Sequence, residues 1–166
     1  MTTAVPVSER RIRVGMVLMG VSHGFLALVG LFLVTVFTAS ATSSSSDDPV
    51  GLMVWFAVVG VAGAAVVGAM AVTLVRGSRA EIGTPKAVSL AAISRRLVWA
   101  ALIVVLLGLA TGALWAFAGS GPTSTAFLYG LLAAMPCLML LGSVLSIRWY
   151  FQYLVTGGNA SSSATA

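Results

Sequence analysis

His23 is the residue of this chain with the widest chemical repertoire, because an imidazole can donate or accept hydrogen bonds, transfer a proton or bind a metal ion. It lies within residues 14–39, a stretch that carries no formal charge. A polar side chain in the middle of such a stretch must find a partner or water, which marks a candidate functional site. We therefore predict a polar site formed by His23 with Ser22 and Pro136.

Two interpretations of His23 remain open from the sequence. In the structural one, which we prefer, a neutral ring donates one hydrogen bond to Ser22, to Thr111 or to a backbone carbonyl that Pro136 leaves free. In the functional one, the ring lines a transport path. Pro136 stands inside an apolar segment, where it cannot donate a backbone hydrogen bond, so it predicts a kink and open space beside it.

Methionines near His23 allow a third chemistry, a haem or copper site. Met16 and Met19 precede His23 by seven and four residues, which places them on one helical face, and Met139 follows Pro136 closely. Imidazole with thioether ligands suits haem iron or copper. We predict no cofactor, however, because methionine is a common space filler in apolar helices and the chain has a single histidine.

The elements that position these residues are predicted to be membrane helices. Hydrophobic residues make up 59% of the chain and charged residues 8%, a composition that cannot cover the surface of a soluble globule. A helix needs about 20 apolar residues to cross the hydrocarbon of a bilayer. We predict an all-α integral membrane protein with four transmembrane helices, arranged as two antiparallel hairpins in a four-helix bundle, with spans at about 14–39, 50–75, 97–118 and 126–147.

The charged residues predict how this single membrane domain, residues 14–155, is oriented. With the amino terminus inside, all nine Lys and Arg residues fall on the cytoplasmic side, so we predict cytoplasmic termini in the cell membrane. The inner side would comprise a basic arm at 1–13, a basic loop at 76–96 and a flexible tail at 156–166. Thr84 followed by Pro85 predicts a helix start within that loop. The cations expected to hold lipid headgroups are Arg76, Arg79, Lys86, Arg95, Arg96 and Arg148.

No function can be assigned from a motif, but several classes are disfavoured. The predicted spans contain no Asp, Glu, Lys or Arg, and ion-coupled transporters generally carry a charge there. No set of residues for hydrolytic or phosphoryl-transfer chemistry is apparent, so we predict no enzymatic activity. The net charge of +5 is attributed to orientation, with no nucleic-acid partner.

We predict an accessory or assembly subunit of a larger membrane complex, for example a respiratory or transport complex, with membrane lipids as further partners. One alternative is a small homo-oligomeric channel or carrier with His23 in its path. The other is an electron-transfer subunit that binds haem or copper.

Overall fold

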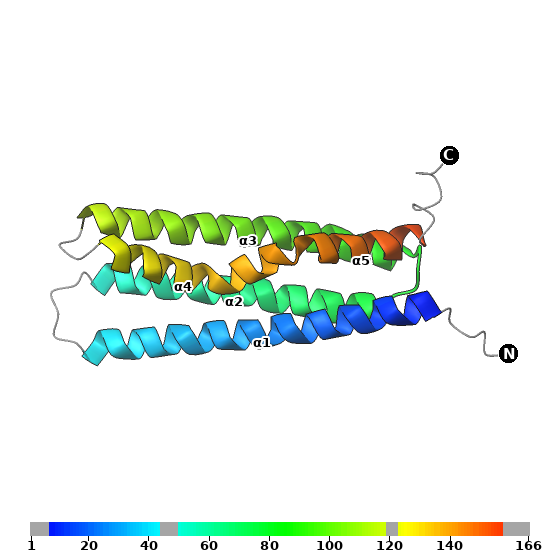
Figure 1. Cartoon of the computed structure of the whole chain (residues 1–166), viewed down its shortest axis with the longest axis horizontal. Helices are drawn as coiled ribbons and strands as arrows, with labels where there is room; N and C mark the ends of the chain where they lie inside the picture. The colour runs from blue at the N-terminus through cyan, green and yellow to red at the C-terminus, as the bar shows by residue number, and fades with distance from the viewer. Residues whose placement is uncertain (1–6, 44–49, 119–122, 158–166) are drawn as a thin grey trace.

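The computed structural model describes residues 7–43, 50–118 and 123–157, and this part of the chain is helical, without a strand. Figure 1 shows the helices lying side by side along one long axis. α1 packs mainly on α2, and α3 mainly on α4. The five helices are α1 (Val7–Ser43), α2 (Val50–Ser78), α3 (Pro85–Ala118), α4 (Thr123–Gly142) and α5 (Val144–Thr156).

Three of these helices are long and apolar enough to cross a membrane. The qualifying segments are Glu9–Val36 in α1, Val54–Ser78 in α2 and Pro85–Leu114 in α3, with 28, 25 and 30 residues. In the described part of the chain the number rises to four if Ala134–Gly142 and Val144–Thr156 form one bent span. Each of the three segments exceeds the roughly 20 residues that a hydrocarbon core requires, which indicates a membrane protein.

The helices extend further than the predicted spans. The sequence placed a basic loop at 76–96, but α2 continues to Ser78 and α3 begins at Pro85, so residues 79–84 make the whole connection. The helix start at Pro85 is confirmed. The Ala87 amide donates to the Thr84 hydroxyl over 3.3 Å, which satisfies one of the amides left free at a helix start.

The predicted basic arm at 1–13 overlaps the start of α1, which begins at Val7. The Arg13 guanidinium contacts the Glu9 carboxylate at 2.7 Å, one helical turn away, and this pair supports the first turns of α1. At the other end of the chain, α5 continues to Thr156 and the described residues end at Gly157. The predicted tail beyond that point lies outside them.

The predicted fourth span, 126–147, is two helices rather than one. The bend between them is 55° and falls at Ser143, a position that the sequence analysis did not predict. Ser143 has φ −96° and ψ 3°, and its amide donates to the Leu140 carbonyl, three residues back, over 3.0 Å. This tighter bond replaces the bond to the fourth residue back that an α-helix requires, and the helix axis changes direction.

Pro136 itself lies inside α4 and leaves no space beside it. Its ring is buried and faces Gly30 of α1, where an added Cβ would lie 2.8 Å from the Pro136 Cγ. The expectation of open space at this position is therefore wrong. The absence of a side chain at Gly30 allows the proline ring to pack against the α1 backbone.

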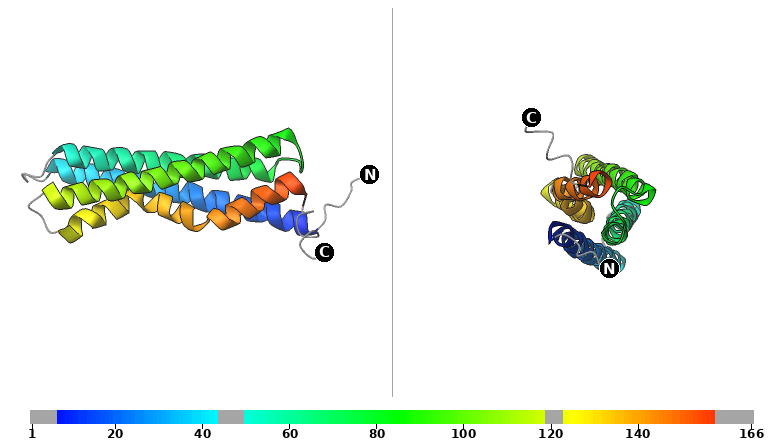
Figure 2. Two further views of the ribbon diagram at one scale, coloured as in Figure 1. Left: turned by 90° about the horizontal axis from the view of Figure 1, so that it is seen from above. Right: turned by 90° about the vertical axis from the view of Figure 1, so that its right-hand side faces the viewer.

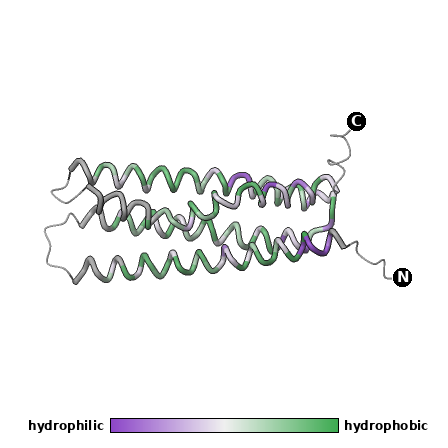
Figure 3. Tube along the Cα trace, viewed as in Figure 1, coloured by the Kyte–Doolittle hydropathy of each residue, from purple (hydrophilic) through white to green (hydrophobic). Residues whose placement is uncertain are grey.

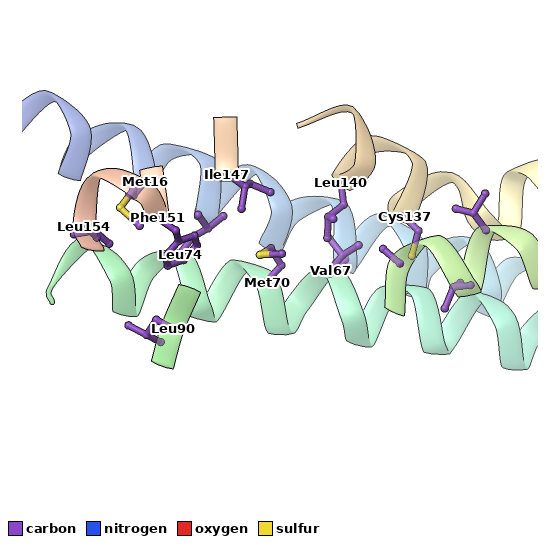
Figure 4. Packing of buried hydrophobic residues seen from close by; sticks show 14 of the residues in the cluster. Met16, Val67, Met70, Leu74, Leu90, Cys137, Leu140, Ile147, Phe151 and Leu154 are labelled. Atoms are coloured by element: carbon purple, nitrogen blue, oxygen red, sulfur yellow. The ribbon is translucent and has the colours of Figure 1, made fainter. Parts of the chain in front are cut away.

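Small residues set the spacing between α1 and α2 as well. A Cβ on Gly20 would lie 2.9 Å from the Val75 side chain, and one on Gly60 would overlap the Val34 side chain. Figure 2 shows α1 and α2 packed along their length. Further inside, large apolar residues of several helices fill the core; Met16, Met70, Leu74, Leu140 and Phe151 are among those labelled in Figure 4.

Hydrophilic residues gather at the end of the molecule where α1 begins and α5 ends (Figure 3). Two contacts join the elements there. Arg13 of α1 donates to the Ser78 carbonyl at the end of α2 over 2.9 Å. The Gly83 amide donates to the Leu154 carbonyl of α5 over 2.9 Å.

Candidate functional site

His23 lies on the buried face of α1 and reaches the break between α4 and α5. The side chain is 4% exposed. Its Nδ1 lies 2.8 Å from the Met19 carbonyl oxygen, one turn earlier in the same helix. Its Nε2 lies 2.9 Å from the Ser143 hydroxyl oxygen, 120 residues later in the chain. The ring therefore links α1 to the residue at which the last span changes direction.

The partners of the ring define its tautomer when it is neutral. A carbonyl oxygen can only accept, so Nδ1 carries the proton and donates to Met19. Nε2 is then an acceptor, and the Ser143 hydroxyl donates to it. The Leu140 carbonyl, which also lies 2.8 Å from that hydroxyl, still accepts the Ser143 amide. Every polar group of the site has a partner in this arrangement.

A protonated ring would be equally well provided with hydrogen bonds. Both nitrogens then donate, Nδ1 to Met19 and Nε2 to the Ser143 oxygen. The serine hydroxyl turns to donate to the Leu140 carbonyl, which is within 2.8 Å. Rotation of one hydroxyl hydrogen thus converts the arrangement that serves the neutral ring into the one that serves the charged ring.

The sequence identified His23 but not its partner. Ser22 is exposed, and Thr111 accepts a hydrogen bond from the Trp55 indole over 2.6 Å. Ser143 was missed, although a signal was present. It follows Gly142 within an apolar run, and Gly/Ser pairs are among the few causes of sharp kinks in helices.

The residues proposed as weak metal ligands are not arranged as a site around His23. Both ring nitrogens are engaged, as described above. The Met16 methyl group faces Gly77 of α2, and Met139 is 49% exposed, while Met19 packs at the edge of the core. Within the described ranges there is also no group of three or more His, Cys, Asp or Glu residues that could hold a metal ion.

The six cations expected to meet lipid headgroups are all exposed. They lie at the end of α2, in the connection after it, in the first part of α3 and in α5. Arg13 differs from them, because its guanidinium is held between Glu9 and the Ser78 carbonyl. The exposed group is therefore free to meet an external anion.

Comparison with known proteins gives no further information, since no protein-family model, no curated protein and no solved structure matches this chain. The class that the described residues define is an all-helical protein with three to four helices able to cross a membrane.

Proposed function

We propose that this chain is a non-catalytic multi-pass membrane protein, a four-helix bundle with both termini cytoplasmic, that serves as an accessory or assembly subunit of a larger membrane complex. The topology is supported by the location of the cations. The exposed basic residues gather at one end of the helices (Figure 3), and cytoplasmic segments carry an excess of Lys and Arg. An even number of spans returns the chain to the side on which it started.

The observation that carries the accessory role is the outer face of α1. In its most apolar window 22% of α1 is buried, against 50% of α2, so α1 lies at the edge of the molecule. Its exposed face carries large residues spaced alternately by four and three positions: Val14, Leu18, Val21, Phe25, Leu28 and Phe32, which are 51–67% exposed.

This spacing is the heptad repeat with which one helix packs its side chains between those of another. Every face of an α-helix repeats at this spacing, so what distinguishes the exposed face of α1 is the size of its side chains. The stripe, which we call the α1 outer stripe, is therefore suited to a transmembrane helix of a partner subunit. Phe25 and Phe32, two turns apart, provide the largest side chains of this surface.

The alternative of a channel with His23 in its path receives less support. A path-lining histidine needs access to water or to the transported species. His23 is 4% exposed and both of its nitrogens are engaged with protein groups. The haem or copper alternative is disfavoured by the same engagement, because a ligand nitrogen must offer a free lone pair to the metal.

The test is purification in mild detergent through an affinity tag, followed by mass spectrometry of the eluate. We expect larger membrane subunits in fixed stoichiometry, and we expect Phe25→Ala with Phe32→Ala to remove them. Ile103→Ala with Leu106→Ala is the matched control, because these α3 residues are 55% and 56% exposed and lie outside the α1 outer stripe. Elution of the wild-type chain alone, as a homo-oligomer, would contradict the accessory role.

Topology is tested separately by thiol labelling in a Cys137→Ser background. A cysteine introduced at Ser89, an exposed residue near the start of α3, should react with a membrane-impermeant reagent only after the cells are opened. Reaction in intact cells would reverse the proposed orientation.

A further inference from the structure

A groove between α3 and α5 lies at the hydrophilic end of the molecule. Its volume is about 540 Å³, within the range of 300–1,000 Å³ that is typical of small-molecule sites. The α5 side of the groove begins at Val144, immediately after the break at Ser143. The groove thus lies along the helix that the 55° bend sets apart from the direction of α4.

The groove combines an apolar wall with two cations. Val98 and Trp99 of α3 and Val144 and Phe151 of α5 supply apolar surface, while Arg95 and Arg148 enter from the two opposing helices. Both arginines are exposed. Within the described ranges neither guanidinium is paired with an acidic side chain, so the charge of both is available to an outside group.

The depth of Arg95 and Arg148 in the membrane indicates what kind of molecule the groove binds. Arg95 precedes the uncharged stretch 97–118, and Arg148 follows the uncharged stretch 126–147. Both therefore stand where hydrocarbon gives way to headgroups. Two exposed tryptophans mark the same level, Trp99 at 66% and Trp149 at 55%. Tryptophan is enriched at this boundary because its ring is apolar while its N–H needs a polar partner.

We infer that this groove is a binding site for one anionic phospholipid, with Arg95 and Arg148 holding the phosphate and an acyl chain lying against the apolar wall. A guanidinium is suited to this because its planar N–H groups match the oxygens of a phosphate in pairs. The apolar wall explains why a diacyl lipid is favoured over a soluble phosphate. The inference rests on the membrane location in the proposed function, but it requires no partner subunit.

The experiment is native mass spectrometry of the purified full chain in detergent, titrated with dioleoylphosphatidylglycerol or with dioleoylphosphatidylcholine. We expect one phosphatidylglycerol to remain bound and phosphatidylcholine to bind more weakly. Arg95→Gln and Arg148→Gln should each weaken binding by about fivefold, equivalent to ~1 kcal/mol. The double variant should weaken binding more than either single variant, and because both arginines hold one phosphate the two effects need not multiply.

Arg96→Gln is the matched control. Arg96 is exposed, carries the same charge and is adjacent to Arg95, but it does not line the groove, so its loss should change binding by less than about twofold. An equal loss in Arg96→Gln and Arg95→Gln would show a diffuse electrostatic attraction and overturn the inference. Displacement of the lipid by glycerol phosphate at similar concentration would overturn it too, because a soluble phosphate would then be the better occupant.

Failure of this proposal is distinguishable from failure of the accessory role. Lipid titration uses the isolated chain, whereas the accessory role is judged by co-purification and by the α1 outer stripe, which lies on a different helix. A chain that elutes without partners but retains one phosphatidylglycerol would support the groove and reject the accessory role.

Discussion

Two of the side-chain hydrogen bonds between helices in the described part of the chain differ in how many arrangements they permit. Trp55 of α2 donates its indole N–H to the Thr111 hydroxyl of α3 over 2.6 Å, and that hydroxyl donates to the Leu107 carbonyl over 2.7 Å. An indole nitrogen can only donate, so Thr111 must accept from it and has one arrangement. His23 can donate or accept through Nε2, so Ser143 has two.

The two contacts also differ in whether the helix that they hold is continuous or broken. Thr111 lies within α3, which runs unbroken from Pro85 to Ala118. Ser143 lies between α4 and α5 at a 55° bend. The Trp55 contact therefore joins two continuous helices in one arrangement, whereas the His23 contact lies at a helix break and allows two hydrogen-bond arrangements. The comparison teaches that the type of ring decides how many hydrogen-bond arrangements a contact between helices allows.

The largest effect should come from removing the His23 ring. His23→Ala leaves a cavity on the buried face of α1 and removes the link to Ser143, so we expect a loss of about 2–4 kcal/mol in the free energy of unfolding. Denaturant titration in detergent micelles measures it. A loss smaller than that of Trp55→Phe would show that the Trp55 contact contributes more to the free energy of unfolding than the His23 contact.

Ser143→Ala should have the next largest effect. It leaves Nε2 of His23 buried without a donor, at a cost of about 1–3 kcal/mol. In a His23→Ala background the same change should cost less than about 0.5 kcal/mol, because the acceptor is no longer present. Equal costs in the two backgrounds, measured by the same titration, would show that the hydrogen bond between His23 and Ser143 does not contribute to the free energy of unfolding.

Trp55→Phe should cost less, about 0.6 kcal/mol, which is the average for hydrogen bonds between membrane helices. The Thr111 hydroxyl remains bonded to the Leu107 carbonyl, and Trp55 is 44% exposed, so little cavity forms. The shift in thermal midpoint provides the measurement. A loss as large as that of Ser143→Ala would mean that the fixed contact is the more important one.

Ser22→Ala provides the smallest expected change and the control for the other three. Ser22 neighbours His23 in the sequence but is exposed, so the free energy of unfolding should remain within about 0.5 kcal/mol of wild type. A larger loss in the same titration would restore Ser22 to the site in which the sequence analysis placed it.

The helices themselves were predictable because long uncharged stretches and the Thr84-Pro85 start are local signals. The partner of His23 was not, because it depends on the rotation and depth of helices far apart in the sequence. In a soluble helix the apolar stripe identifies the buried face. In helices apolar on all sides, such as α2, that information is absent. The contact of Pro136 was not predictable for a related reason: it is made with Gly30 of another helix, which residues 126–147 alone could not show.

The length of α3 has a mechanical consequence. Its 34 residues span about 51 Å at 1.5 Å per residue, whereas the hydrocarbon core is about 30 Å thick. On the proposed placement, roughly 20 Å of the same helix stands clear of the hydrocarbon. A rigid helix transmits rotation and axial displacement over its whole length. A force applied at Lys86 would therefore move Leu97 and the residues beyond it together with the exposed part of the helix.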